Sequence, residues 1–283
     1  MYQVGLSSDG KELCENLFSA YRENGIKAIE ISPARDDFDS VPYRDIKNWG
    51  EKYGVKLWSF HLPFSPFDKW NISDKALSNA TVTYFKELIK KATDIGIDKF
   101  VIHGSGEPIN SDERSERMEI AKGSLFRLAE FAGKYNAVIA VENLPRTCIG
   151  RNSTEINELT SAHPALRVCY DTNHLLSGEN AVDFIKNVGN KIITTHISDY
   201  DFVNERHWLP GEGKLDFASI LQALKEVEYK GVWMYEIGFK CPKTIYRNRD
   251  LTCADFARNA KELFAGEKPT VFSMPKPDLG YWE

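Results

Sequence analysis

The 283-residue chain lacks the features that mark several classes of protein. No run of apolar residues approaches the ~18 that a helix needs to cross a bilayer, so we do not expect a membrane protein. The 36 Lys and Arg residues are outnumbered by 41 Asp and Glu, which gives a net charge of -5. An acidic chain has no general electrostatic attraction for nucleic acid, so nucleic acid is not an expected partner.

Cysteine is scarce and shows no pattern. An odd number of widely spaced cysteines without a CxxC pair argues against a disulfide framework and against a structural zinc ribbon. The sequence also does not open with the basic segment and apolar stretch of a signal peptide. We therefore expect free thiols and a cytoplasmic protein, although a signal peptide removed beforehand would leave the same pattern. The five cysteines are Cys14, Cys148, Cys169, Cys241 and Cys253.

What the sequence does contain is a repeated unit of an amphipathic helix pattern, a turn and a short apolar run. Near-continuous apolar runs of this length are typical of parallel strands buried on both faces. Strands that alternate with helices eight times predict an α/β fold, a single-domain (β/α)8 TIM barrel. A doubly wound sheet is the alternative, but no GxGxxG follows the first run. The runs are 4–6, 26–31, 55–60, 100–102, 138–141, 168–170, 192–195 and 232–235.

The expected barrel occupies residues 1–265, and residues 266–283 form a C-terminal tail. The tail contains Pro269, Pro275 and Pro277, which cannot belong to a regular helix interior. We expect an extended segment there.

Residues with metal-ligand or acid/base side chains follow or end seven of the eight runs. A single such residue would mean little, because polar groups at strand ends often bond to loops. In a barrel, however, the carboxyl ends of all strands converge on one mouth, where active sites are built. Seven such residues at the ends of different strands therefore predict an active site at this mouth. They are Glu30, His61, His103, Glu142, Asp171, His196 and Glu236.

Four of these residues form a plausible metal site: Glu142, Asp171, His196 and Glu236. Three carboxylates and one imidazole suit a divalent cation such as Mn²⁺, Zn²⁺, Co²⁺ or Mg²⁺. Four ligands leave positions open for two substrate oxygens. With such a cation as a Lewis acid, a carboxylate could remove a proton next to a carbonyl and form an enediolate.

Five motifs along the chain point to a known family. Together they resemble the xylose isomerase-like barrel superfamily, which includes sugar-phosphate isomerases and epimerases, ketose 3-epimerases and the endonuclease IV family. The resemblance covers essentially the whole chain. The motifs are Val-Glu-Asn-Leu-Pro at 141–145, Tyr-Asp-Thr-Asn-His at 170–174, Thr-His-Ile-Ser-Asp at 195–199, Arg-His-Trp-Leu-Pro-Gly-Glu-Gly-Lys-Leu-Asp-Phe at 206–217 and Tyr-Glu-Ile-Gly at 235–238.

The resemblance implies roles for individual residues. The four proposed ligands match the metal ligands of the epimerase branch, in which the two glutamates also move the proton on opposite faces of the sugar. Glu142 and Glu236 are thus the expected catalytic residues. His174 matches a position that contacts substrate in epimerases, and Arg206 lies where the family often has a basic substrate-binding residue. The full set to which we assign substrate binding is His61, His103, His174, Arg206 and His207.

We therefore expect a metal-dependent sugar or sugar-phosphate isomerase or epimerase. One alternative is an inosose dehydratase-like lyase on the same metal site, since the enolate chemistry is shared. Another is an endonuclease IV-like phosphodiesterase that cleaves abasic DNA, whose ligand pattern is largely present. That family has Asp-Arg-His where this chain has Glu205-Arg206-His207, and the net charge of -5 also disfavours it. A third is a non-catalytic sugar-binding protein, which the four intact ligands disfavour.

The expected partner is a small sugar or polyol. The segment 62–70, which follows the third run, is rich in aromatic residues. Aromatic faces suit the C–H faces of a sugar, a partner subunit of a homodimer or homotetramer, or simple packing of the loop. These three interpretations stay open from the sequence.

Overall fold

The computed structural model describes residues 1–33, 38–64, 66–175, 178–277 and 279–280. Its barrel strands are β1 (Val4–Ser7), β2 (Ala28–Ile31), β3 (Lys56–His61), β4 (Lys99–His103), β5 (Val138–Glu142), β6 (Arg167–Asp171), β7 (Ile192–His196) and β8 (Trp233–Tyr235). Its helices are α1 (Glu15–Glu23), α2 (Tyr43–Tyr53), α3 (Ser78–Thr93), α4 (Arg114–Gly133), α5 (Ser153–Thr160), α6 (Ala181–Val188), α7 (Phe217–Glu226) and α8 (Cys253–Phe264), with a 3-10 turn at Gly189–Lys191.

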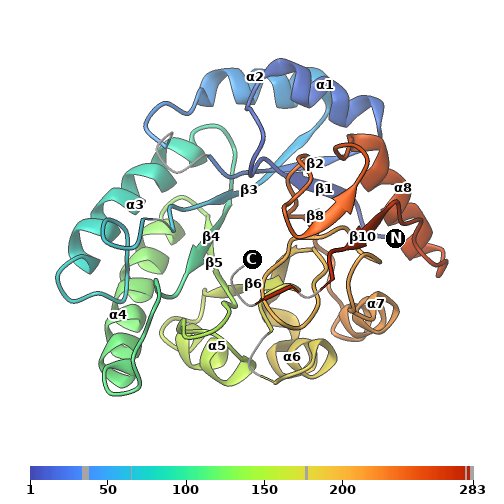
Figure 1. Ribbon diagram of the computed structural model, residues 1–283. Coiled ribbons are helices and arrows are strands. Elements are labelled where there is room, and N and C mark those ends of the chain that lie inside the picture. Colours follow the sequence, from blue (N-terminus) through green and yellow to red (C-terminus); the bar gives the residue numbers. More distant parts are fainter. Residues whose placement is uncertain (34–37, 65, 176–177, 278, 281–283) are drawn as a thin grey trace.

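The eight strands form one parallel sheet in the order β7-β6-β5-β4-β3-β2-β1-β8. A parallel bridge between Ile197 and Tyr235 joins the last neighbours, so the sheet curves into a nearly closed barrel. The helices surround it as an outer ring (Figure 1). The predicted (β/α)8 barrel, in one domain, is confirmed.

The sequence explains why these elements form. In β2 all four residues are buried, as a strand with the barrel interior on one face and helices on the other requires. At the start of α8, Thr252 and Asp255 form a reciprocal capping box that satisfies exposed backbone donors. Helix α2 ends at Gly54, whose φ of 64° lies in the left-handed region that glycine adopts without cost.

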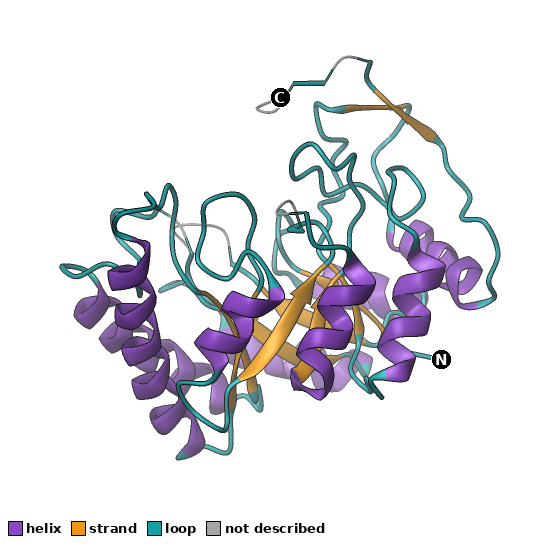
Figure 2. Ribbon diagram, turned by 90° about the horizontal axis from the view of Figure 1, so that it is seen from below, coloured by secondary structure: helices purple, strands orange, loops and turns teal. Residues whose placement is uncertain are grey.

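Two short strands were not predicted. Strands β9 (Ile245–Arg247) and β10 (Ser273–Pro275) pair antiparallel, and β10 belongs to the predicted C-terminal tail. Their three-residue length and mixed composition leave too little periodicity to recognise. Figure 2 shows this pair on the same side of the barrel as the long loops, well away from the barrel strands. Positions 278 and 281–283 of the tail lie outside the described residues.

The described helices include none that is both long and apolar enough to cross a membrane. The longest of them, α4, carries charged residues along its length and packs against α3. The long loops that follow the strands collect at the carboxyl end of the barrel, where the candidate site lies.

Candidate active site

The four predicted ligands meet at the mouth of the barrel, and we call Glu142, Asp171, His196 and Glu236 the inner group. The Nδ1 atom of His196 lies 3.0 Å from an oxygen of Glu142, 3.5 Å from one of Glu236 and 3.9 Å from one of Asp171. One ligand atom from each of the four residues lies within 4.8 Å of every other. The side chains at the carboxyl ends of β5 to β8 thus lie together, as the sequence predicts.

Strand register brings these side chains together. Asp171 pairs directly with His196 across β6 and β7, beyond a register shift between Val168 and Cys169. Irregular pairing of this kind is common beside active sites, where it changes the direction of a side chain. Asn143, the residue after Glu142, holds Asp171 in place, because its side chain accepts the Asp171 N–H at 2.8 Å and donates to the Asp171 carbonyl at 2.9 Å.

The inner group contains strongly perturbed acids. Burial by itself raises the pKa of Glu142, but the imidazoles of His196 and His103 outweigh burial and hold this pKa well below its ordinary value. Burial and the charge of Glu142 raise the pKa of Asp171 well above its ordinary value. Burial, with the charges of Glu142 and Asp171, does the same to the pKa of Glu236. The carboxyl groups thus compete for ionisation in one small volume.

The inner group has the properties of a divalent cation site. The Oδ2 atom of Asp171 is buried and, among the described residues, has no hydrogen-bond partner. An unsatisfied buried carboxylate oxygen is costly unless a cation coordinates it. A divalent cation would also offset the repulsion among three carboxylates. The donor set therefore fits Mn²⁺, Zn²⁺, Co²⁺ or Mg²⁺ and does not select among them.

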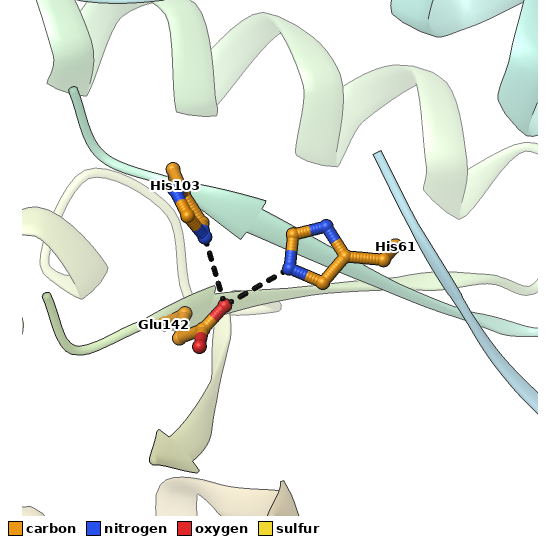
Figure 3. A group of neighbouring side chains, drawn as sticks. All are labelled: His61, His103 and Glu142. Carbon is orange, nitrogen blue, oxygen red and sulfur yellow. Dashed lines mark hydrogen bonds and ion pairs between the residues drawn. The ribbon is translucent and has the colours of Figure 1, made fainter. Parts of the chain in front are cut away.

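Two of the predicted substrate-binding residues hold one oxygen of Glu142, and a third, His174, places its Nδ1 atom 3.5 Å from the other oxygen. The Nε2 atoms of His61 and His103 lie 3.1 Å and 3.2 Å from the same oxygen of Glu142 (Figure 3). These two histidines and Glu142 form a second group whose candidate ligand atoms lie within 4.8 Å of one another. Burial lowers the pKa of His61, but Glu142 and Glu30 outweigh it and raise this pKa to about 9. Both side chains line the cavity at the mouth, where they can also reach a ligand.

The other two predicted histidines join a third group, the outer cluster, which consists of His174, Glu205 and His207. The Nε2 atom of His174 lies 3.4 Å from Glu205, and its Nδ1 atom lies 2.8 Å from the carbonyl of Asn143. His207 has a φ of 48°, uncommon for a residue other than glycine. Its side chain is 40% exposed, whereas that of His196 is fully buried.

The structure does not bring Arg206 into the cavity. Its guanidinium group is buried against the carboxylate of Asp201, at 2.8 Å, and donates to the carbonyl of Gly280 in the C-terminal tail. A different arginine lies there. Arg146, in the loop after β5, lines the cavity and pairs with Glu107 and Glu205.

The cavity has a volume of about 330 Å³ and an acidic, aromatic lining. The rings of Phe64 and Phe67 line it, and Phe64 stacks on His103 with ring centroids 4.7 Å apart. Farther along the same aromatic loop, Trp70 stacks on Tyr84 at 4.3 Å, so this part of the loop packs against α3. Residue 65 of the loop lies outside the described residues.

Two residues of the cavity, Arg146 and Glu107, were not predicted from the sequence. Arg146, with a φ of 52°, and Glu107 lie in irregular loops, where no periodicity places a side chain. The only available signal for Arg146 was its position three residues after Asn143, directly beyond a strand-end motif. Asp199, which its position three residues after His196 predicts to cap a loop rather than to bind metal, accepts backbone N–H groups of Tyr200, Gly211, Gly213 and Leu215 and so organises the loop after β7.

Comparisons with known proteins agree with this geometry. The profile of the xylose isomerase-like TIM barrel family matches residues 18–250. The uncharacterized protein MJ1311 of Methanocaldococcus jannaschii is 26% identical over 190 residues, which are 64% of this chain and 64% of that protein, a little under two thirds of its length. The D-psicose 3-epimerase of Enterocloster bolteae is 25% identical over 231 residues, 75% of this chain and 72% of that enzyme. In fold, the crystal structure of a D-tagatose 3-epimerase-like protein superposes with a TM-score of 0.79 at 22% identity, covering 94% of this chain and 97% of that one.

Proposed function

Because the chain belongs to the xylose isomerase-like TIM barrel family, we propose that it is a sugar isomerase or epimerase that uses a divalent cation and moves a proton next to a carbonyl group. The observation that supports the proposal is the inner group, in which two glutamates with opposite pKa shifts lie close enough to a histidine and an aspartate for all four to hold one cation. The similarity to a D-psicose 3-epimerase supports it.

The two glutamates would divide the proton transfer between them. A divalent cation bound by the inner group would act as a Lewis acid that stabilises negative charge on the substrate oxygens. The surrounding charges keep Glu142 ionised, so it can accept the proton, and they favour a proton on Glu236, so it can donate one. Since Glu142 ends β5 and Glu236 follows β8, the two carboxyl groups approach a bound sugar from different parts of the rim.

Other residues of the cavity would orient the substrate. His61 and His103 fix one oxygen of Glu142, which leaves the other facing His196. The rings of Phe64 and Phe67 offer apolar surface to the C–H face of a sugar. These contacts favour a compact polyhydroxy ligand.

The charge of the cavity favours a sugar without a phosphate group. Among its described lining residues, Arg146 is the one guanidinium group, and Glu107 and Glu205 already neutralise it. The lining also includes Asp9 and Glu142, and His61, whose pKa is raised to about 9, already pairs with Glu142, so an added phosphate would compete with these carboxylates. We therefore propose an uncharged ketose or related polyol as the substrate.

Deuterium exchange tests this function. Protein loaded with Mn²⁺ would be incubated in D₂O with a panel of ketoses, their phosphates and cyclic polyol ketones, with chelator-treated protein as the control. We expect deuterium at a carbon next to the carbonyl of an uncharged sugar, and none in the control. Exchange only with phosphorylated sugars would overturn the proposed substrate class, and no exchange with any member of the panel would overturn the function.

The additional ligand groups favour one other candidate, a phosphodiesterase of the endonuclease IV type. His61, His103 and Glu142 form one group beside the inner group, and the outer cluster forms another. Three such groups could hold more than one cation. Metal analysis after dialysis against Zn²⁺ separates the candidates: one ion per chain supports the sugar enzyme, whereas three ions with cleavage of abasic DNA support the phosphodiesterase.

A further inference from the structure

Glu30 is a buried carboxylate that does not line the cavity, and its contacts indicate a different task. It lies in β2 and is fully buried. Its oxygens lie 2.9 Å and 3.1 Å from the Nε2 atom of His196. The hydroxyl of Ser59, also fully buried, donates to one of the same oxygens at 2.7 Å. Glu30 thus contacts the inner group at the Nε2 atom of His196.

The two ring nitrogens of His196 have separate partners. The Nδ1 atom faces the carboxylates of Glu142, Glu236 and Asp171, and the Nε2 atom faces Glu30. A histidine can bind a cation through Nδ1 only if that nitrogen carries no proton, so the remaining ring proton must be on Nε2. Glu30 stands where it can accept that proton in a hydrogen bond.

The strand pairing supplies Glu30 with its second partner. Strands β2 and β3 pair Ile29 with Leu57 and then Glu30 with Ser59, so the register skips Trp58. Without this shift, Trp58 would lie opposite Glu30. The irregular register therefore places the hydroxyl of Ser59 beside the fully buried carboxylate of Glu30. Two independent features, the register and the His196 contact, converge on Glu30.

We propose that Glu30, held by Ser59, is a positioning residue that fixes His196 with its proton on Nε2 and its Nδ1 lone pair directed at the bound cation. Carboxylates that accept a hydrogen bond from the ring N–H of a metal-bound histidine raise its basicity and restrict its rotation. The inference rests on the proposed metal site but not on which substrate is converted. It assigns a function to Glu30, the one strand-end acid of the seven predicted residues that lies outside the predicted metal site.

Cation affinity is the first test. Binding of Mn²⁺ would be measured by calorimetry on full-length wild type, Glu30→Ala, Glu30→Gln and Ser59→Ala. We expect a tenfold to hundredfold weaker affinity for Glu30→Ala, as is usual when such a partner is removed. Glu30→Gln, which keeps an acceptor but loses the charge, should lie between the two, and Ser59→Ala should show the smallest loss.

Matched controls separate this role from stability. Asp255 is a buried carboxylate in α8 that pairs with Arg249 and Arg258, and Ser124 is a buried serine in α4 that donates to the Ile72 carbonyl. Asp255→Asn and Ser124→Ala should lower the thermal midpoint without changing Mn²⁺ affinity. If Glu30→Ala fails to fold, the comparison of Glu30→Gln and Ser59→Ala with these controls still decides the question.

The protonation of the ring is the second test. In Zn²⁺-loaded protein labelled with ¹⁵N-histidine, we expect the His196 signals of a metal-bound Nδ1 and a protonated Nε2. Wild-type Mn²⁺ affinity in both Glu30→Ala and Ser59→Ala, or a proton on Nδ1 in the loaded protein, would overturn the inference. Neither Mn²⁺ affinity nor the protonation of His196 depends on substrate turnover. A protein that passes both tests but exchanges no sugar would therefore contradict the proposed function and leave this inference standing.

Discussion

The inner group and the outer cluster lie side by side at the same mouth, yet they are built differently. Glu142, Asp171 and His196 end barrel strands and are almost fully buried, with Glu236 one residue beyond β8. The outer cluster takes two of its three members, Glu205 and His207, from the loop after β7, and both are partly exposed. The strands fix the first group, whereas a folded loop supports most of the second.

This difference separates fixed chemistry from adjustable chemistry. A strand-end group changes position only if the barrel changes, so it suits a cation that every catalytic cycle requires. Loop residues can shift with small changes in sequence, so they suit recognition of a particular substrate or an additional ion. The predictions below test whether the two groups indeed divide the work in this way.

The largest effect is expected from Glu142→Gln. Loss of this carboxylate removes both a ligand and the proposed base, so we expect α-proton exchange to fall by about 10²–10⁴-fold, with cation binding also weakened. Exchange would be followed by NMR in D₂O, and circular dichroism would confirm the fold. Glu155→Gln, at a carboxylate on α5 that pairs with Arg114, is the control and should keep wild-type exchange. Wild-type turnover in Glu142→Gln would remove this residue from the catalytic role.

A smaller effect is expected from the outer cluster. In His174→Ala, the first equivalent of Mn²⁺ should bind with nearly wild-type affinity, because the inner group keeps all its ligands. Substrate affinity should fall by about tenfold, the value of one lost hydrogen bond to a substrate group. Titration with Mn²⁺ and steady-state KM measurements check both statements. Loss of all cation binding in this variant would show that the two groups form one indivisible centre.

The pH dependence of cation affinity should distinguish the groups further. Burial raises the pKa of Asp171, and acidic neighbours raise the pKa of His196 despite its burial, so a cation must displace protons from these two ligands. Affinity should therefore rise with pH by about tenfold per unit for each proton displaced, and level off above these pKa values. Calorimetry in buffers with different ionisation enthalpies measures the protons released. Binding without proton release would contradict these pKa shifts.

The same pKa shifts set the sign of a stability effect. The raised pKa values of Asp171 and Glu236 mean that these carboxyl groups bind protons more tightly in the folded than in the unfolded chain. Their protonation stabilises the cation-free protein at low pH, and this contribution is lost as pH rises through the raised values. Added Mn²⁺ should therefore raise the thermal midpoint more at pH 8 than at pH 6. An equal rise at both would contradict the expectation.

The smallest effect concerns the loop that supports the outer cluster. Asp199→Asn places an amide where two oxygens accept four backbone N–H groups, which should destabilise the fold by about 1–3 kcal/mol. For a chain of this size that is a decrease of several degrees in thermal midpoint, at about 2–4 °C for each kcal/mol. Affinity for the first Mn²⁺ should not change. A large loss of that affinity would mean that the loop also maintains the inner group.

The sequence predicted the barrel and the inner group for one physical reason. Buried parallel strands leave a strong apolar pattern, and a residue directly after such a run has a defined place on the rim. Glu142, Asp171 and His196 could be placed by that rule alone. Arg146 and Glu107 could not, because they lie in loops whose path depends on contacts distant in sequence. Arg206 shows the limit of a motif: its position matched the family, but its side chain pairs with Asp201 rather than facing the cavity.

Anomalous diffraction from Mn²⁺-loaded crystals tests the central claim most directly. We predict one strong manganese peak bonded to carboxylate oxygens of Glu142, Asp171 and Glu236 and to the Nδ1 atom of His196. A map with manganese only at His174, Glu205 and His207, or with no peak among the four strand-end residues, would contradict it.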